Sequence, residues 1–287
     1  ELVSEMLGVD IIKIDGWDGL PESRVVFLEN LRFNPAEKSK DESERDEFGK
    51  QLASLAEIYV NDAFSNCHRD QASMTSVPKF IPGCIGLSVE KEVDTIGSAV
   101  QSPERPVVAI IGGLKADKLN TINNILPLVD QVLVGGALAY ALLKERGTSI
   151  GATKLDKEGM DSSKEIISNI INDPKVLLPV DAVIADKFDE HANKEQVSLS
   201  GIKDDWMVLD IGSETVRLYT EQIEEAKTVL FFGPPGVFEM EKFADGTKNI
   251  IKAMAESSAK TIVGGGDSAS AVEMFGYTDK MSLVSTG

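Results

Sequence analysis

The fold assignment rests on the stretch Thr261–Val272, which reads TIVGGGDSASAV. Apolar and β-branched residues run into three glycines, and an alanine-rich helical pattern follows, so we expect a strand, a glycine turn and a helix. Asp267 and Ser268 offer N-cap chemistry at the start of that helix. Glycines let the backbone approach a ligand closely, and the first N–H groups of a helix attract anions. The turn is therefore either a phosphate site or a plain structural connection, and other stretches have to decide.

The composition is that of a globular protein with acidic character. The 287 residues are 42% hydrophobic and 26% charged, which is enough apolar material for two modest cores. The net charge of −18 argues against nucleic acid and against an anionic membrane as partners, because both carry dense negative charge. Two cysteines, Cys67 and Cys84, suggest neither a disulfide framework nor a zinc site and fit a reducing cytoplasm. No apolar run has the length of a membrane span, and we expect a cytoplasmic monomer.

The second half of the chain alternates strand and helix patterns at a regular spacing. We expect strands at 107–111, 131–134, 176–178 (leading into 179–186), 228–232 and, as the last, 262–263. Such spacing requires right-handed crossovers and a mostly parallel, doubly wound sheet, which is a three-layer α/β fold. Four of these strands end in a glycine-bearing turn, and in a parallel sheet such turns gather along one edge. None fits GxGxxG or GxxxxGK[ST], which counts against a dehydrogenase and a P-loop ATPase.

The first half is less regular. We expect a short helix that Gly8 ends, a strand at 9–14, a buried strand at 24–29, an amphipathic helix over 41–59 and a strand at 58–60. A helical pattern then covers 87–100, and the Pro-containing segment after it ends the helix. We therefore place a substrate domain at 1–86, an interdomain helix and hinge at 87–102 and a nucleotide-binding domain at 103–287.

Two strand ends in the first half carry cations. Arg32 follows the strand at 24–29, and Arg69 follows the polar loop after 58–60. Ligands of open α/β sheets bind at the carboxyl ends of strands, so both arginines could hold an anion, although position alone favours a surface role for Arg32. His68 beside Cys67 is best explained as a structural loop residue, because no third group is evident that would orient a nucleophile.

Four further residues suggest the chemistry of the second half. Lys115 and Lys118 lie in the turn after 107–111, where ammonium groups either follow phosphoryl oxygens or are simply solvated. Asp267 could act on phosphates through Mg²⁺, or it could only cap the helix. Glu239 could accept hydrogen bonds from ribose hydroxyls, or be an exposed acid. Together they indicate phosphoryl transfer by positioning and electrostatics, without a protein nucleophile.

Several sequence blocks occur in one order over nearly the whole chain. They are VVFLENLRF, YVNDAF with HR soon after, VVAIIGG with its lysines, LLPVDAVIAD, GPPGVFEMEKFADGTK, and IVGGGDSASAVEMFG with VSTG at the end. With these blocks the sequence resembles the phosphoglycerate kinase family. The resemblance implies two Rossmann-like domains that are joined by a helix and close on their ligands. It also implies reversible transfer of the acyl phosphate of 1,3-bisphosphoglycerate to Mg-ADP, which yields 3-phosphoglycerate and ATP in glycolysis.

The resemblance assigns a role to each candidate residue. Arg32 and Arg69 resemble the ligands of the nontransferred phosphate of the glycerate. Glu239 resembles the ribose ligand, and Asp267 resembles the metal-linked acid. The implied catalytic set is Lys115, Lys118, Gly265 and Gly266. The implied nucleotide set is Gly113, Lys118, Gly135, Gly136, Gly212, Glu239, Gly265, Gly266, Asp267 and Ser268.

The sequence also departs from the family pattern. An upstream Asp-Phe-Asn-like motif, a catalytic arginine and a further His/Arg pair have no counterpart, and the stretch that usually follows VSTG is absent. We expect a piece of a longer protein, or a shortened gene. The lysine turn is one residue shorter than GGAKxxDK, Phe232 stands where an Asn is usual, Ala137 replaces a third glycine, and DIGSET replaces DxGPxT.

Three hypotheses for function follow. The first is a glycolytic phosphotransferase of this family. The second is a nucleotide-binding homologue with reduced or lost catalysis, which Phe232 and the short lysine turn suggest. The third is a different Rossmann-like enzyme. We also expect the given chain by itself to be a poor kinase, because in-line transfer needs cations on both sides of the moving phosphoryl group.

Overall fold

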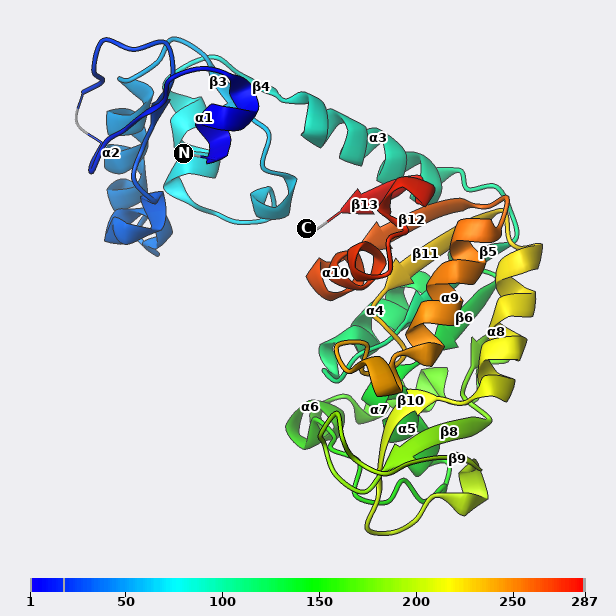
Figure 1. Ribbon diagram of the computed structural model, residues 1–287. Coiled ribbons are helices and arrows are strands. Elements are labelled where there is room, and N and C mark those ends of the chain that lie inside the picture. Colours follow the sequence, from blue (N-terminus) through cyan, green and yellow to red (C-terminus); the bar gives the residue numbers. More distant parts are fainter. Residues whose placement is uncertain (1, 18, 286–287) are drawn as a thin grey trace. The chain divides into compact units, whose positions relative to one another are not determined.

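The computed structural model describes residues 2–17 and 19–285 (Figure 1). The chain divides into two compact units, Glu1–Val93 and Asp94–Gly287. The division falls inside helix α3 (Leu87–Gln101), within the segment that we predicted to join two domains. The domain limits themselves stay a prediction.

The second unit is built on a six-stranded sheet in which every pair of neighbouring strands is parallel. In spatial order its strands are β13 (Leu283–Ser285), β12 (Lys260–Gly264), β11 (Thr228–Phe232), β5 (Val107–Ile111), β6 (Gln131–Val134) and β7 (Val176–Leu177). The five predicted strands are all present in this sheet. The prediction that 262–263 is the last strand was wrong, because β13 adds an edge strand beside β12.

Helices cover both faces of this sheet (Figure 1), and the side chains of β5 show why. Ala109 and Ile111 face one apolar cluster, while Val108 and Ile110 face the other, as the two-residue period of a strand requires. Burial on both faces is typical of parallel sheets and gives the predicted three-layer arrangement. The first cluster contains residues of α4 (Asp117–Ile125), α5 (Gly136–Glu145) and α7 (Lys164–Ile170), and the second contains residues of α8 (Ser213–Glu225), α9 (Asp245–Glu256) and α10 (Gly266–Met274).

A second, antiparallel sheet belongs to the same unit and was not predicted. Its strands are β10 (Met207–Ile211), β8 (Asp181–Ala185) and β9 (Lys194–Ser198), in the order β10-β8-β9. We had joined 179–186 to the strand before it, but β7 ends at Leu177 and β8 pairs in the other sheet. All five residues of β8 are buried, so its sequence reads like a parallel core strand.

The first unit contains two small parallel sheets and two helices of its own. The helices are α1 (Leu2–Leu7) and α2 (Glu42–Ala53), and the strand pairs are β1 (Ile12–Lys13) with β2 (Val26–Phe27) and β3 (Tyr59–Asn61) with β4 (Gly83–Ile85). The prediction of a buried strand at 24–29 was wrong: only β2 forms, and Phe27 is 56% exposed. Among the described residues β2 pairs only with β1, so one of its edges lacks a covering strand. The predicted helix over 41–59 ends at Ala53.

No helix in the described part of the chain is long and apolar enough to cross a membrane.

Candidate functional site

The glycine turns at the ends of three neighbouring strands lie against one another, as we predicted. A Cβ atom on Gly112 would lie 2.0 Å from the carbonyl oxygen of Pro234, so β5 and β11 leave no room there for a side chain. The Gly136 N–H donates to the carbonyl of Pro235 at 2.7 Å, and a Cβ atom on Gly136 would lie 2.4 Å from the Gly113 nitrogen. The turns that follow β5, β6 and β11 therefore pack backbone against backbone at one edge of the sheet.

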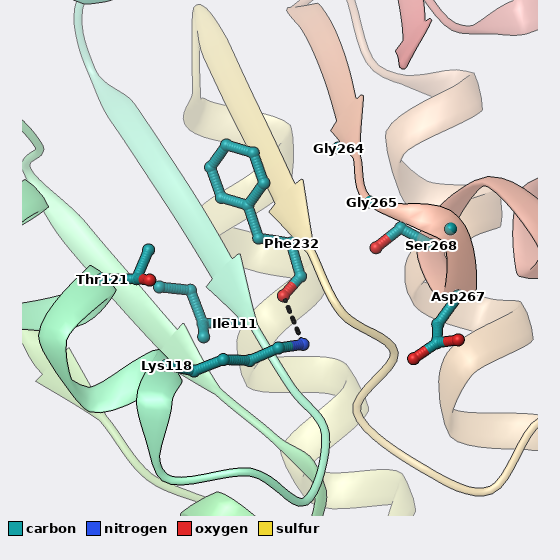
Figure 2. A pocket seen from close by; sticks show the side chains of 9 residues that line it. Ile111, Lys118, Thr121, Phe232, Gly264, Gly265, Asp267 and Ser268 are labelled. Atoms are coloured by element: carbon teal, nitrogen blue, oxygen red, sulfur yellow. Dashed lines mark hydrogen bonds between the residues drawn. The ribbon is translucent and has the colours of Figure 1, made fainter. Parts of the chain in front are cut away.

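A cavity of about 330 Å³ opens at this edge of the sheet, between α4 and the turn that precedes α10 (Figure 2). Its lining comes from the ends of β5, β11 and β12, from the first two turns of α4 and from the start of α10. The lining residues are Ile111, Lys118, Thr121, Phe232, Gly264, Gly265, Gly266, Asp267 and Ser268. Five of the predicted site residues, Lys118, Gly265, Gly266, Asp267 and Ser268, thus meet in one cavity.

The turn into α10 differs from the prediction in one respect. Neither Asp267 nor Ser268 caps the helix: the N-cap is Gly265, with φ +93° and no side-chain hydrogen bond. A residue with a Cβ atom rarely adopts this backbone conformation, so glycine makes the turn possible. Asp267 consequently lies inside the first helical turn, where its carboxylate points into the cavity (Figure 2). The first-turn N–H groups of Gly266, Asp267 and Ser268 have no acceptor within the helix and are available to an anion.

Lys118 is the cation of this cavity. Its Nζ donates to the carbonyl of Gly112 at 2.6 Å and to the carbonyl of Phe232 at 3.1 Å (Figure 2), so it bridges the ends of β5 and β11. Two glycines with positive φ make space for the amine. A Cβ atom on Gly113 would lie 3.0 Å from Nζ, and one on Gly233 would lie 2.4 Å from it.

Burial lowers the pKa of Lys118, while the charges of Asp267 and Asp117 raise it in turn. The ammonium is thus partly withdrawn from water and faces a carboxylate across the cavity. A phosphate group would fit between Lys118 and the first turn of α10, because both attract negative charge. Asp267 repels the same phosphate unless a divalent cation lies between them.

The side chains around the cavity decide whether Mg²⁺ can bind there. The described residues contain no group of three or more His, Cys, Asp or Glu side chains that could hold a metal ion by themselves. Asp267 supplies a single carboxylate at the cavity wall. Because Mg²⁺ commonly binds through one or two carboxylates together with substrate phosphates and water, this donor set fits a metal that arrives with a nucleotide.

Phe232 forms an apolar wall of the cavity. Its ring packs directly on the backbone of Gly264, since a Cβ atom on that glycine would lie 2.5 Å from the ring atom Cε1. Ile111 adds a second apolar side chain and Thr121 a hydroxyl-bearing one. The sequence had marked Phe232 only as a departure from the family pattern, and Ile111 and Thr121 were missed. Thr121 lies one helical turn after Lys118, and that spacing could have indicated it.

Lys115 and Glu239 do not line the cavity, and both are exposed. The turn that carries Lys115 is held by Asp156, which accepts the N–H groups of Ala116 at 3.1 Å and Gly159 at 3.2 Å. These two hydrogen bonds, the Ala116 bond first, and the charge of Lys115 hold the pKa of Asp156 below its usual range. The shortened turn is therefore a fixed structure, with Lys115 at its surface.

Gly212 likewise lies apart from the cavity lining. It precedes α8, where its N–H donates to the carbonyl of Asp181 at 3.4 Å. A Cβ atom there would lie 2.2 Å from the Asp181 carboxylate, so close packing against β8 explains this glycine. Gly113, Gly135 and Gly136 belong to the packed glycine turns described above.

Both predicted arginines of the first unit make a hydrogen bond to Asn66, Arg32 through its side chain and Arg69 through its backbone. The Arg32 guanidinium donates through Nη2 to the side-chain oxygen of Asn66 at 2.9 Å, and the Arg69 N–H donates to the Asn66 carbonyl, also at 2.9 Å. Both arginines are exposed. The loop is fixed on its other side because Arg45 pairs with Asp70 at 2.7 Å. Asn66, which we did not predict, thus holds the Arg32 guanidinium with its side chain and closes the backbone turn that carries Arg69.

Comparison with known proteins gives a consistent result. The family model described as phosphoglycerate kinase matches residues 8–287. The phosphoglycerate kinase of Clostridium tetani is 44% identical over 273 residues, which cover 94% of this chain and 67% of that protein. The phosphoglycerate kinase of Clostridium botulinum strain Loch Maree is 41% identical over 299 residues, which cover 99% of this chain and 74% of that protein.

Solved structures that resemble this chain belong to the same family. The chain is similar to phosphoglycerate kinase from Coxiella burnetii, with a TM-score of 0.84 and 34% identity over 99% of this chain and 74% of that one. It is also similar to phosphoglycerate kinase from Pyrococcus horikoshii OT3, with a TM-score of 0.88 and 30% identity over 100% of this chain and 75% of that one.

Proposed function

The chain belongs to the phosphoglycerate kinase family of glycolytic phosphotransferases, and we propose that its cavity holds the phosphates of Mg-ADP and Mg-ATP. One observation carries the proposal. Lys118 and Asp267 face each other across a cavity whose third side is the glycine turn and first turn of α10. A cation, helix N–H groups and one carboxylate are what a magnesium-bound polyphosphate requires.

The proposed reaction needs positioning and charge stabilisation from the chain. The bond between phosphorus and the acyl oxygen of 1,3-bisphosphoglycerate breaks, and phosphorus bonds to a terminal oxygen of ADP. The electron pair leaves with the carboxylate of 3-phosphoglycerate, so no protein nucleophile takes part. Lys118 and the N–H groups of Gly266 and Ser268 would stabilise charge on the phosphoryl oxygens. Magnesium held by Asp267 would neutralise further phosphate charge.

The remaining assignments rest on the position of each residue. Arg32 and Arg69 would bind the nontransferred phosphate of the glycerate, for which exposed guanidinium groups are suited. Lys115, exposed on its turn, would reach the transferring phosphate when the ligands are bound.

The nucleoside would lie beside the glycine turns at Gly113, Gly135 and Gly136, with Gly212 further along. Glu239 would accept hydrogen bonds from the ribose. We propose that the protein is a monomer. We also propose that it works in the cytoplasm, and the cysteine usage supports this location.

Calorimetric titration with Mg-ADP tests the nucleotide site. We expect Lys118→Met to weaken binding by about tenfold or more, because it removes the charge that faces the phosphates. Lys252→Met is the matched control, since Lys252 is exposed on α9 and pairs only weakly, at 3.8 Å, with Glu256. Equal affinity of the Lys118 variant and the control, or no binding of Mg-ADP by the unaltered chain, would contradict the proposal.

A further inference from the structure

A buried carboxyl group lies behind the proposed nucleotide site. Asp210, on β10, is only 1% exposed. Its Oδ2 accepts the N–H of Gly246 at 2.6 Å, and its Oδ1 accepts the N–H of Ile211 at 2.9 Å. Gly246 belongs to the first turn of α9, and the N-cap residue Ala244 makes no side-chain hydrogen bond there. A side chain from another element therefore satisfies an N–H group that the helix leaves without an internal partner.

Two glycines fit closely around this carboxyl group. A Cβ atom on Gly236 would lie 1.9 Å from Asp210 Oδ1, and a Cβ atom on Gly246 would lie 2.3 Å from the same oxygen. Both close approaches are to the carboxyl group, so the backbone of the loop and the backbone of the helix pack directly on it. Any larger residue at either position would displace the loop, the helix or the aspartate.

The loop has two more attachments at the same point. The Gly236 N–H donates to the hydroxyl of Thr247 at 3.2 Å, and the Val237 N–H donates to the carbonyl of Leu209 at 2.8 Å. Thr247 is fully buried in α9. The middle of the loop is thus fixed to β10 on one side and to the start of α9 on the other.

The near end of the same loop forms part of the nucleotide site. Pro235 accepts the N–H of Gly136, and Gly233 packs beside the Lys118 amine. Glu239, the proposed ribose ligand, follows Gly236 by three residues. The segment Gly233–Glu239 therefore runs from the phosphate cavity to the proposed ribose side, and its middle rests on Asp210 and Thr247.

We propose that Asp210 and Thr247 are positioning residues for nucleotide binding, which hold Gly233–Glu239 in the geometry that the nucleotide requires. The inference rests on the proposed nucleotide site. Neither residue lines the cavity, so each acts through the loop. Because the loop is already ordered before the nucleotide binds, the free energy of binding is not reduced by the entropic cost of ordering the loop.

Two variants test the role, with a third as control. Asp210→Asn keeps the shape but puts an NH2 group, which cannot accept a hydrogen bond, in place of one of the two accepting oxygens. Thr247→Val removes the acceptor of the Gly236 N–H at nearly constant volume. Glu37→Gln is the control: Glu37 is also a buried carboxylate, 2% exposed, and accepts an N–H and a hydroxyl from Ser73, but it lies in the first unit.

The measurements are amide hydrogen exchange of residues 233–239 and calorimetric titration with Mg-ADP. We expect faster exchange in this segment for both variants, unchanged exchange in β5 and β6, and Mg-ADP binding about three- to tenfold weaker. Glu37→Gln should match the unaltered chain in both measurements. If Asp210→Asn does not fold, Thr247→Val carries the test.

The outcomes separate this inference from the proposed function. Exchange of residues 233–239 that is the same in the variants and the unaltered chain overturns the positioning role, whether or not the nucleotide binds. Faster exchange with unchanged Mg-ADP affinity also overturns it, because the order of the loop would then not matter to the ligand. Failure of the unaltered chain to bind Mg-ADP instead overturns the proposed nucleotide site.

Discussion

Replacing Asp210 by Asn should change how the free energy of unfolding depends on pH. Burial raises the pKa of this carboxyl group to about 8, from 3.8 in the ordinary case, although hydrogen bonds from Gly246 and Ile211 act in the opposite direction. The folded protein therefore binds a proton more tightly than the unfolded chain does. The resulting stabilisation is complete below about pH 4 and is lost as the pH rises toward 8.

The size of this change in the free energy of unfolding follows from the pKa shift of Asp210. One pKa unit corresponds to about 1.4 kcal/mol, so Asp210 contributes a slope of about −1.4 kcal/mol per pH unit between those limits. From about pH 5 to about pH 8 the stability of the unaltered chain should fall relative to that of Asp210→Asn by about 4 kcal/mol. The Asn side chain does not titrate, so any loss that it causes is a constant offset and leaves this difference in slope intact.

Urea denaturation at a series of pH values gives the measurement. Trp206 lies in the second unit and Trp17 in the first, so fluorescence in a Trp17→Phe background reports the unit that contains Asp210. Asp156→Asn is the control: hydrogen bonds from Ala116 and Gly159 lower the pKa of Asp156, so its contribution is lost only under more acidic conditions. Parallel stability curves for the unaltered chain and Asp210→Asn over this range would refute the reasoning.

Three other changes give independent tests. Gly136→Ala places a Cβ atom at φ +64° and 2.4 Å from backbone, so we expect a loss of about 2–4 kcal/mol in urea denaturation, and a loss below about 0.5 kcal/mol would contradict the geometry. Phe232→Ala removes the ring that packs on the cavity wall and should cost about 2–4 kcal/mol in the same assay, whereas an unchanged midpoint would mean that the ring is not packed. Arg32→Ala and Arg69→Ala should each weaken binding of 3-phosphoglycerate by about tenfold and leave Mg-ADP binding unchanged, and an effect on Mg-ADP alone would remove both from the proposed substrate site.

The activity of the 287-residue chain by itself is a separate prediction. We expect a coupled assay to detect turnover far below the rate usual for kinases, even when the chain binds Mg-ADP, because transfer needs cations on both sides of the phosphoryl group. Turnover at the rate usual for kinases, roughly 1–100 per second, would contradict it.

The sequence was sufficient for five strands of the six-stranded sheet, but not for its edge strand β13 or for the smaller sheet. Apolar runs that end in glycine turns identify β5, β6, β11 and β12, because strands buried on both faces read as continuous apolar segments. The same signal misplaced β8, since complete burial looks alike in a parallel and an antiparallel strand. Local pattern carries no information about which sheet a strand joins.

Asp210 shows a second limit of sequence reasoning. A single acid inside the apolar strand Met207–Ile211 is visible in the sequence, but its role depends on Gly236 and Gly246, which reach it from 26 and 36 residues away. Buried carboxyl groups are rare unless hydrogen-bonded, so an acid in a core strand signals that partners exist without identifying them.

The corrected cap of α10 explains how one short turn can serve two ligand types. Had Asp267 been the N-cap, its carboxylate would have accepted a first-turn N–H, and both groups would have been consumed by the helix itself. With Gly265 in that position, the N–H groups stay available to phosphate, and the carboxylate of Asp267, two residues later, stays available to a cation. A glycine whose φ of +93° excludes most side chains is therefore the feature that separates the anion-binding and metal-binding functions proposed for Gly264–Ser268.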